Sequence, residues 1–293
     1  MASIIITGAN GFIGSHLVSH FARRGWKVIA LVHTMPYKLI KEVIYLQYEL
    51  EKGPDTGIFI NADYLVHAAY VKQHHNPDSF RINTEGTAKL LEEARKAKLQ
   101  KIIFLSSLSA VEDAESVYGK QKFELQKMFD RNNELVFRPG LVIGNGGIFK
   151  AIYDYIAAKS FIPLIGGGHQ PMHTISVADL AVAIDRALET DLKGTITIAE
   201  ETAIEMKTLY KEIAITAGKS PVFVPLPYWL AFFILSAMKM FGMKTPVGKE
   251  NLMGLRKSRK ENPKKDLEKL GMKVSPYYES VARMKSGLIT GTK

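Results

Sequence analysis

The chain has 293 residues, of which 46% are hydrophobic and 23% charged, and it contains no Cys. This composition is typical of a folded globular protein, and the lack of Cys excludes a disulfide scaffold, a thiolate metal site and a cysteine nucleophile. The formal net charge is +10, and residues 244–293 carry most of it, with thirteen Lys and Arg against five Asp and Glu. Such a basic segment either forms a solvated helical surface or attracts nucleotides, nucleic acid or lipid headgroups.

Two features of the sequence bear on membranes and location. Residues 1–6 read Met-Ala-Ser-Ile-Ile-Ile, without the basic region and separate apolar stretch of a signal peptide, so a cytoplasmic location is expected. The longest apolar run, residues 228–238, falls short of the roughly 20 residues that a membrane-spanning helix needs. We therefore expect no transmembrane segment.

The first half of the sequence alternates strand and helix patterns. Strands are predicted at residues 3–7, 27–32, 64–68, 102–105, 135–137 and 141–143. Helices are predicted at residues 12–24, 84–99 and 118–129. This alternation is typical of βαβ units, which build a parallel sheet covered by helices on both faces.

The second half is less regular. Helices are predicted at residues 148–158 and 177–188, a strand at 194–198, and a Pro- and Gly-rich loop at 161–171. After about residue 200 the chain reads as mostly helical and more hydrophobic. No internal repeat or low-complexity tract is present.

A glycine-rich turn lies between the first strand and the first helix. Residues 7–14 read Thr-Gly-Ala-Asn-Gly-Phe-Ile-Gly, which places glycines at positions 8, 11 and 14. In a dinucleotide-binding turn the first glycine permits the tight bend, the second admits the pyrophosphate and the third packs the helix on the strand. Backbone N–H groups and the positive end of the helix dipole then face the phosphates.

This turn resembles that of the extended short-chain dehydrogenase/reductase superfamily and, within it, the NAD-dependent epimerase/dehydratase family. The resemblance extends over nearly the whole chain. It also includes Leu-Val-His-Ala-Ala at 65–69, Asn-Thr-Glu-Gly-Thr at 83–87, Phe-Leu-Ser-Ser at 104–107, Tyr-Gly-Lys-Gln-Lys at 118–122, Arg-Pro-Gly at 138–140 and Val-Ala-Asp-Leu-Ala at 177–181.

Together with the order of elements, the resemblance implies an α/β fold, a Rossmann doubly wound parallel sheet with a smaller, mostly helical C-terminal substrate lobe. Residues 1–145 are expected to form the NAD(P)-binding domain, with 170–199 returning to it. Residues 146–169 and 200–293 are expected to form the substrate-binding lobe. By the same analogy, we expect a homodimer with the helices at 84–99 and 118–129 in its interface.

The resemblance also implies the site residues. The catalytic residues would be Ser107, Tyr118 and Lys122. The cofactor contacts would come from the glycine-rich turn, the ends of the following strands and the catalytic helix: Gly8, Asn10, Gly11, Phe12, Ile13, Gly14, His33, His67, Ala68, Ala69, Asn83, Tyr118, Lys122 and Arg138. One departure from the family pattern is that only eleven positions separate Ser107 from Tyr118, which suggests a more open site.

The chemistry of the three catalytic candidates is consistent with proton exchange at a substrate oxygen. Tyr118 and Lys122 are four residues apart and share one face of a helix. A tyrosine with its ordinary pKa near 10 is a poor base, and a nearby ammonium lowers that pKa. Tyr118 would then exchange a proton with a substrate oxygen while hydride moves at the adjacent carbon, and Ser107 would hold that oxygen.

The choice between NAD and NADP depends on the end of the second strand. NAD-selective sites often carry an Asp or Glu there for the ribose 2′-hydroxyl. Here His33 and Thr34 follow the strand, and Lys38 comes soon after. The missing acid and the nearby cationic groups favour NADP over NAD.

The substrate is less well specified. Many nucleotide-sugar members of the family carry an Arg seven residues before the Asp that corresponds to Asp179, whereas this chain has Met172. Other members act on sterols, flavonoid-like ketones and other carbonyl or hydroxyl compounds. The apolar residues 225–240 are interpreted as a core helix, with a pocket wall, an oligomer contact or an interfacial membrane helix as alternatives.

The sequence leaves three alternative functions open. The functional alternatives are an NADPH-dependent reductase of a hydrophobic carbonyl compound and a dinucleotide-binding protein without turnover. Binding of nucleic acid or a membrane surface through the basic segment is a third class, and nucleic acid is not favoured. No metal site is expected, because the only close histidine pairs, His74 with His75 and His169 with His173, lack a ligand pattern.

Overall fold

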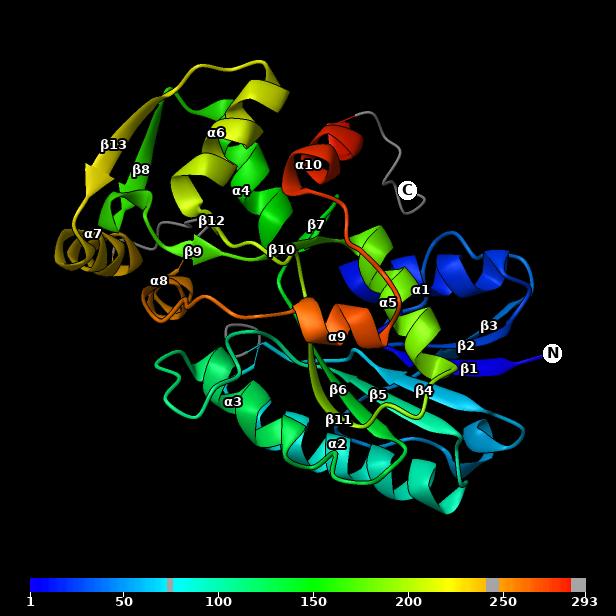
Figure 1. The fold of residues 1–293 in the computed structure, drawn as a ribbon. Coiled ribbons are helices and arrows are strands. Elements are labelled where there is room, and N and C mark those ends of the chain that lie inside the picture. Colours follow the sequence, from blue (N-terminus) through cyan, green and yellow to red (C-terminus); the bar gives the residue numbers. More distant parts are fainter. Residues whose placement is uncertain (73–75, 241–247, 286–293) are drawn as a thin grey trace.

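A large parallel sheet forms one end of the molecule. A computed structural model of the chain describes residues 1–72, 76–240 and 248–285. Within these residues, seven parallel strands are ordered β11-β6-β5-β4-β1-β2-β3 (Figure 1). They are β1 (Ser3–Thr7), β2 (Lys27–Val32), β3 (Val43–Gln47), β4 (Tyr64–His67), β5 (Lys101–Leu105), β6 (Glu134–Pro139) and β11 (Gly194–Ile198). The strand order reverses between β1 and β4, which is where such folds bind ligands at the carboxyl ends of the strands.

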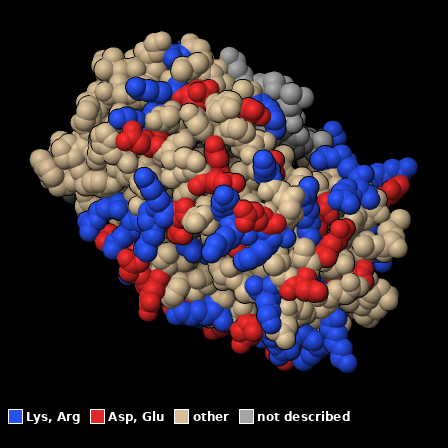
Figure 2. Space-filling view, viewed as in Figure 1, with Lys and Arg blue, Asp and Glu red and all other residues tan. Residues whose placement is uncertain are grey.

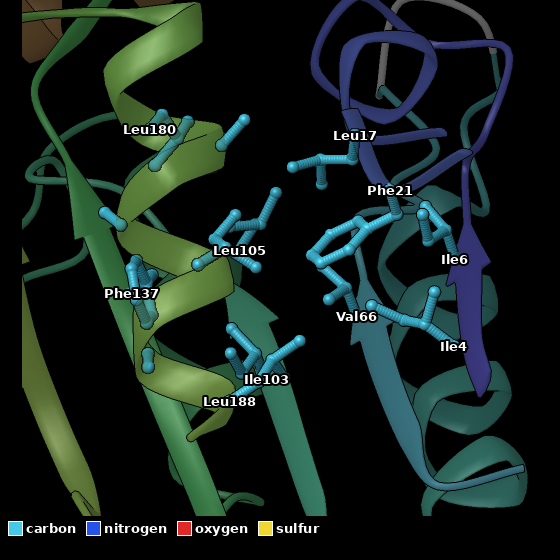
Figure 3. Packing of buried hydrophobic residues seen from close by; sticks show 14 of the residues in the cluster. Ile4, Ile6, Leu17, Phe21, Val66, Ile103, Leu105, Phe137, Leu180 and Leu188 are labelled. Atoms are coloured by element: carbon cyan, nitrogen blue, oxygen red, sulfur yellow. The ribbon is translucent and has the colours of Figure 1, made fainter. Parts of the chain in front are cut away.

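Helices cover both faces of this sheet. Helices α1 (Phe12–Arg23) and α5 (Val177–Leu188) lie on one face, and α2 (Ser79–Lys96) and α3 (Val117–Gln126) lie on the other (Figure 1). Successive strand residues alternate between faces: Ile4 and Ile6 pack against α1, whereas Ile5 packs in the cluster on the α2 side (Figure 3). The predicted doubly wound α/β fold is confirmed.

A second, smaller lobe forms the other end of the molecule. It contains α4 (Gly147–Ala158), α6 (Met206–Ala217), α7 (Tyr228–Met240), α8 (Lys249–Arg256) and α10 (Tyr277–Lys285). Short strand pairs connect and border it: β7 (Leu141–Ile143) with β10 (Thr174–Ser176), β8 (Phe161–Ile165) with β13 (Val222–Leu226), and β9 (Pro171–Met172) with β12 (Ile204–Glu205). A separate core of Phe149, Ile156, Leu209, Ile213 and Val281 holds α4, α6 and α10 together.

The predicted loop at residues 161–171 is wrong in part, because β8 occupies its first five positions and β9 its last. Strand β8 pairs with β13, from Phe161 opposite Val222 to Ile165 opposite Leu226. The partner lies about sixty positions further along the chain, so no local pattern indicates the pairing. Strand β3 is likewise absent from the predicted elements, because this half-exposed edge strand lacks a clear alternation.

The C-terminal segment returns to the large sheet. Leu267 and Leu270, in and directly after α9 (Lys264–Lys269), join the core beneath α1 and α5, together with Met272. The Asp266 carboxylate accepts a 2.8 Å hydrogen bond from the backbone N–H of Thr197 in β11. This differs from the domain division expected from the sequence, which places residues 200–293 in the substrate lobe.

Several cations of the basic segment are held by acids of the large lobe. Arg256 pairs with Glu115 at 3.0 Å, and Lys257 and Arg259 pair with Asp113 at 3.3 and 2.6 Å. These pairs fasten α8 to the loop between β5 and α3 and neutralise part of the charge that the sequence concentrates there. In the part of the chain that the structure describes, no helix is long and apolar enough to cross a membrane.

Candidate active site

The glycine-rich turn closes tightly against the ends of β1 and β4. Gly8 has a φ of +64°, and a Cβ there would lie 2.8 Å from the backbone of Ala69. A Cβ on Gly14 would lie 2.2 Å from the carbonyl oxygen of Gly8, and the N–H of Gly11 donates to that same oxygen at 2.8 Å. Gly8 and Gly14 are therefore required by close backbone contacts, as the sequence predicts for the first and third positions, and a Cβ on Gly11 would lie 3.0 Å from the Gly8 carbonyl oxygen.

The first turn of α1 offers its backbone to an anion. Gly11 precedes the helix, no side chain caps the N-terminus, and no acid stands in the first turn. Asn10 holds the turn to the end of β2 by donating to the Thr34 carbonyl. The Phe12 ring packs on the other side, where a Cβ on Gly146 would lie 2.5 Å from it. This uncapped N-terminus beside close-fitting glycines fits a dinucleotide pyrophosphate.

A buried polar chain supports the turn from below. The Thr7 hydroxyl accepts hydrogen bonds from the backbone N–H groups of Ala68 and Ala69 at 3.1 and 3.0 Å. Its own hydrogen is then directed to Nδ1 of His67, 2.7 Å away, which leaves Nε2 of His67 to donate to Thr87 at 3.0 Å. Burial lowers the pKa of His67 to about 3, helped by the charge of Lys122, so the ring is neutral.

His67 and Asn83 both make their observed contacts with other parts of the protein. His67 is fully buried and stacks on Phe104 with ring centroids 5.6 Å apart. The Asn83 amide makes two 2.8 Å hydrogen bonds with the backbone of Val71, one as donor and one as acceptor. Their observed contacts fix the segment after β4, whose residues Ala68 and Ala69 line the turn.

Ser107 lies at the end of β5, on a loop that Arg138 fixes. The Arg138 guanidinium donates to the carbonyl oxygens of Ser107 and Leu108 at 3.3 and 3.2 Å and faces Glu261 at 3.6 Å. Burial lowers the pKa of Arg138, partly offset by Glu261. In this structure Arg138 thus positions the backbone that carries the Ser107 hydroxyl.

Tyr118 and Lys122 occupy the first two turns of α3. Tyr118 keeps 37% of its surface exposed, and the side chain of Ser107 lies near enough to its phenol to influence the pKa. Burial of the phenol raises its pKa, and this effect outweighs the lowering by Ser107. The three catalytic candidates therefore lie together, since the Lys122 ammonium donates at 2.7 Å to the carbonyl of Leu105, just before Ser107 on the same chain segment.

Lys122 lies in an apolar pocket without an acidic partner among the described residues. Its nitrogen lies 4.7 Å from the ring centroid of Tyr70 and 4.6 Å from that of Phe104. Burial lowers the pKa of Lys122 to about 7. The amine can therefore gain or lose a proton near neutral pH.

Three further residues shape the site, although the sequence analysis did not single them out. The Tyr70 ring meets the Tyr118 ring edge-on at 5.3 Å, and its hydroxyl donates to Gln121 at 2.6 Å. Glu250 in α8 accepts a 2.6 Å hydrogen bond from the backbone N–H of Val117, at the start of α3. Tyr70 and Gln121 adjoin the recognised motifs, whereas Glu250 is 133 positions from Val117 and has no local signal.

The structure also locates the residues considered for cofactor choice. His33 and Lys38 are exposed, and His33 directly follows β2 beside the residue that Asn10 contacts. Glu49, which follows β3, interacts electrostatically with His33, although the hydrogen bond from Lys52 is the main reason that its pKa is lowered. An acid thus reaches this end of the sheet from the neighbouring strand.

Two of the histidines considered as metal ligands, His169 and His173, are placed by the structure. Among the described residues, no three His, Asp or Glu side chains are grouped as metal ligands. His74 and His75 lie outside the described residues. His169 instead pairs with Glu205 at 2.9 Å, and His173 accepts a 2.9 Å hydrogen bond from the backbone N–H of Glu261.

Known proteins resemble this chain in sequence over part of their length. A ceramide reductase of Caulobacter vibrioides is 27% identical over 205 residues, which is 67% of this chain and 64% of that protein. A decarboxylating sterol-4-alpha-carboxylate 3-dehydrogenase of Candida albicans is 27% identical over 132 residues, or 40% of this chain and 37% of that protein. The matched region spans less than two thirds of each relative.

Solved structures share the fold over almost the entire chain. A UDP-glucose 4-epimerase of Thermotoga maritima, solved with UDP-glucose, has a TM-score of 0.72 at 20% identity and covers 98% of both chains. A dTDP-glucose 4,6-dehydratase of Bacillus anthracis, solved with NAD, has a TM-score of 0.73 at 15% identity and covers 98% of this chain and 96% of that one.

The match to a protein family is broader than these pairwise similarities. Residues 4–199 match the model of the NAD dependent epimerase/dehydratase family. This region contains the glycine-rich turn, Ser107, Tyr118 and Lys122, and it amounts to more than half of the chain. The protein therefore belongs to the NAD-dependent epimerase/dehydratase family, as the sequence predicts.

Proposed function

We propose that this protein is an oxidoreductase that uses a nicotinamide dinucleotide to move hydride at a secondary alcohol or ketone. The observation that carries the proposal is the arrangement at the carboxyl edge of the sheet. The uncapped, glycine-lined N-terminus of α1 follows β1, and Ser107, whose side chain lowers the pKa of Tyr118, follows β5, two strands across the same sheet. A phosphate cradle and a proton-transferring pair are thus brought together by strands β1, β4 and β5.

The chain's own groups handle the oxygen and its proton. The Ser107 hydroxyl holds the substrate oxygen, and Tyr118 accepts the hydroxyl proton in oxidation or returns it in reduction. The bound nicotinamide would take up or supply the hydride at the neighbouring carbon. Because burial raises the pKa of Tyr118, a positive charge must favour the phenolate, and Lys122, one helical turn away, offers one in its protonated form, which predominates below about pH 7.

The decisive variant is Tyr118→Phe, which removes the phenolic hydroxyl and keeps the ring against Tyr70. We expect kcat to fall by about 10²–10⁴-fold with an unchanged dissociation constant for the dinucleotide. Tyr278→Phe, at an exposed tyrosine in α10, is the matched control and should keep full activity. Full turnover in Tyr118→Phe would disprove the mechanism. Tight dinucleotide binding without turnover by the wild type would instead support the non-catalytic alternative.

For the substrate, we propose a hydrophobic alcohol or ketone. Met172 replaces the basic residue expected for a diphosphate, and relatives include a ceramide reductase and a sterol-carboxylate dehydrogenase. Nucleotide sugars are the second candidate, because a UDP-sugar reductase of Pseudomonas aeruginosa is 31% identical over 121 residues. Turnover assays with ceramide-like ketones, sterols and UDP-sugars distinguish the two classes.

Cofactor preference follows from the end of β2. The family is described as NAD dependent, so the comparisons do not support the preference for NADP that we predict from the sequence. The acid Glu49, which interacts with His33, also opposes a 2′-phosphate. We therefore propose NAD, and calorimetric titration with NADH and NADPH tests it. Tighter binding of NADPH would restore the original expectation.

The assembly and location of the protein belong to the same proposal. We propose a homodimer formed through α2 and α3, and a cytoplasmic protein. Sedimentation velocity of the wild type tests the first, and fractionation of cells that express it tests the second. A monomer at all concentrations would exclude the dimer.

A further inference from the structure

An apolar surface lies at the end of the small lobe that is farthest from the large sheet (Figure 1). Trp229 and Phe233 in α7 are 72% and 68% exposed, and Phe161 in β8 is 66% exposed. Val222 and Val224, alternate residues of β13, expose about half of their surface beside them. We refer to Phe161, Val222, Val224, Trp229, Phe232, Phe233 and Ile234 as the α7 surface. Figure 2 shows the outermost left edge of the molecule, where α7 lies in Figure 1, without charged side chains, and Lys and Arg side chains below it.

The α7 surface is held in place by contacts at its base. The Tyr228 hydroxyl forms a 2.5 Å hydrogen bond with the Gln170 side chain, which also donates to the Ile165 carbonyl at the end of β8. Ala231, one turn further, is buried. Trp229, Phe232 and Phe233 are exposed because α7 is apolar around its whole circumference and only one side rests on the lobe.

Lysines border this surface at two ends. Lys159 and Lys219 are exposed next to the paired residues Phe161 and Val222, and Lys249 lies with its nitrogen 4.8 Å from the Phe232 ring centroid. Within the described residues, none of these three lysines forms an ion pair with an acid. By contrast, Arg256, Lys257 and Arg259 nearby are engaged by Glu115 and Asp113.

We propose that the α7 surface docks this protein onto an anionic lipid bilayer. Trp and Phe side chains insert at the boundary between headgroups and acyl chains, and lysines at the rim bind anionic headgroups. Helix α7 has 13 residues, which suits a helix lying in the interface plane and not one that crosses the bilayer. Docking through the α7 surface does not depend on the proposed activity.

The distribution of charge favours lipid over a second copy of the chain. In a two-fold dimer the same surface would face itself, so the unpaired lysines at the two ends of its rim would approach lysines at the rim of the second copy. An anionic bilayer supplies the opposite charge at each of these positions without further specificity.

The two tryptophans of the chain permit a direct test. Trp26 packs between Phe21 and Tyr64, with ring centroids at 4.9 and 5.4 Å, so Trp26→Phe leaves Trp229 as the only tryptophan with the packing preserved. This variant is mixed with vesicles of phosphatidylcholine, with and without phosphatidylglycerol. We expect a blue shift of Trp229 emission and its quenching by brominated acyl chains, both stronger with phosphatidylglycerol.

Substitutions separate the apolar and the charged contributions. In the wild-type background, Phe233→Ser should weaken sedimentation with phosphatidylglycerol vesicles by about tenfold or more, since a buried Phe contributes roughly 1.5–3 kcal/mol. Lys249→Glu should weaken binding to phosphatidylglycerol vesicles only. Phe80→Ser, at a 49% exposed Phe in α2 of the other lobe, is the matched control and should bind as the wild type does.

Specific outcomes would overturn the proposal. It fails if Trp229 emission does not change with anionic vesicles, or if Phe233→Ser and Phe80→Ser sediment with vesicles equally well. It also fails if sedimentation velocity without lipid shows a dimer that Phe233→Ser dissociates, because the α7 surface would then be an interface between copies. Unchanged circular dichroism and melting temperature of the variants exclude unfolding as the cause.

Discussion

Each lobe of this protein contains side chains in an unusual environment: the large lobe buries polar side chains, and the small lobe exposes large apolar ones. In the large lobe, polar groups such as Thr7, His67 and Lys122 are buried within an apolar core. In the small lobe, large apolar groups such as Trp229 and Phe233 face outwards. Both arrangements lower the stability of the folded protein, and each therefore indicates a functional role. Buried polar groups mark the chemical site, and exposed apolar groups mark the docking surface.

Glycine substitutions give the largest expected difference between the lobes. Gly14→Ala would place a Cβ 2.2 Å from the Gly8 carbonyl oxygen and force the first turn of α1 away from the strand. We expect affinity for the dinucleotide to fall by more than about 100-fold, because the phosphate cradle is lost. Calorimetric titration measures it. Gly248→Ala, where no atom lies within 4 Å of the added Cβ and φ is negative, should bind as the wild type does.

The buried histidine is the next test of the large lobe. His67→Leu leaves the hydroxyls of Thr7 and Thr87 without their partner, and we expect it to lower the free energy of unfolding by about 1–3 kcal/mol. Urea denaturation measures the change. His67→Gln, which can hydrogen-bond to both threonines, should recover part of it. Equal stability of His67→Leu and the wild type would show that the polar chain adds nothing.

His67 also sets an acid limit to stability. Its pKa is about 3 in the native protein and 6.5 when unperturbed, so between these values only the unfolded chain takes up the proton. Stability due to this group is complete above pH 6.5 and falls with decreasing pH, by up to about 1.4 kcal/mol per pH unit. In His67→Gln the decline between pH 6.5 and 5 should be smaller, which urea denaturation at each pH can measure.

Lys122, in the same lobe, makes the free energy of unfolding depend on pH above pH 7. Its native pKa of about 7 lies below the ordinary 10.5, so from pH 7 to 10 the unfolded chain holds a proton that the native protein has released. The free energy of unfolding should therefore rise with pH in this range, by up to about 1.4 kcal/mol per pH unit. Lys122→Met should remove this slope and keep most of the acid limit set by His67, whose pKa is lowered mainly by burial and to a smaller extent by the charge of Lys122. A wild-type slope retained in Lys122→Met would contradict the assignment.

The smallest effect is expected where the lobes meet through exposed ion pairs. Asp113→Asn removes the carboxylate that holds Lys257 and Arg259. Because exposed pairs contribute little and are screened by salt, we expect the melting temperature to fall by no more than about one degree. Thermal scans at low and high salt should converge. A larger loss that persists at high salt would mean that α8 is held more firmly than these pairs suggest.

Local sequence predicts the large lobe well because its decisive contacts are short-range. The run of β-branched residues in β1, the glycines after it and the spacing of Tyr118 and Lys122 each determine structure within one or two turns. The strand bounds 3–7, 27–32 and 194–198 agree with the structure for the same reason. Candidates for the catalytic residues could therefore be proposed, and the structure brings Ser107, Tyr118 and Lys122 together, whereas their catalytic role stays a prediction.

Contacts between distant residues could not be predicted in this way. Nothing near Val117 indicates that Glu250 binds its N–H, and nothing near Phe161 indicates its pairing with Val222. The roles of His67 and Arg138 were also underdetermined, because a motif shows that a residue is present but not which way it faces. In the structure both turn towards backbone and buried hydroxyl groups, so their direct contact with a cofactor stays a prediction.

The return of α9 to the large sheet has a consequence for how the chain is made. Leu267, Leu270 and Met272 complete a core whose other members begin at Ile4. Domains usually fold in order during synthesis, with the N-terminal one first. Here the N-terminal lobe cannot close its core until the ribosome has added residue 272, after the small-lobe residues up to α8 have already emerged. The core of the large lobe, which carries the glycine-rich turn, therefore stays incomplete through most of translation.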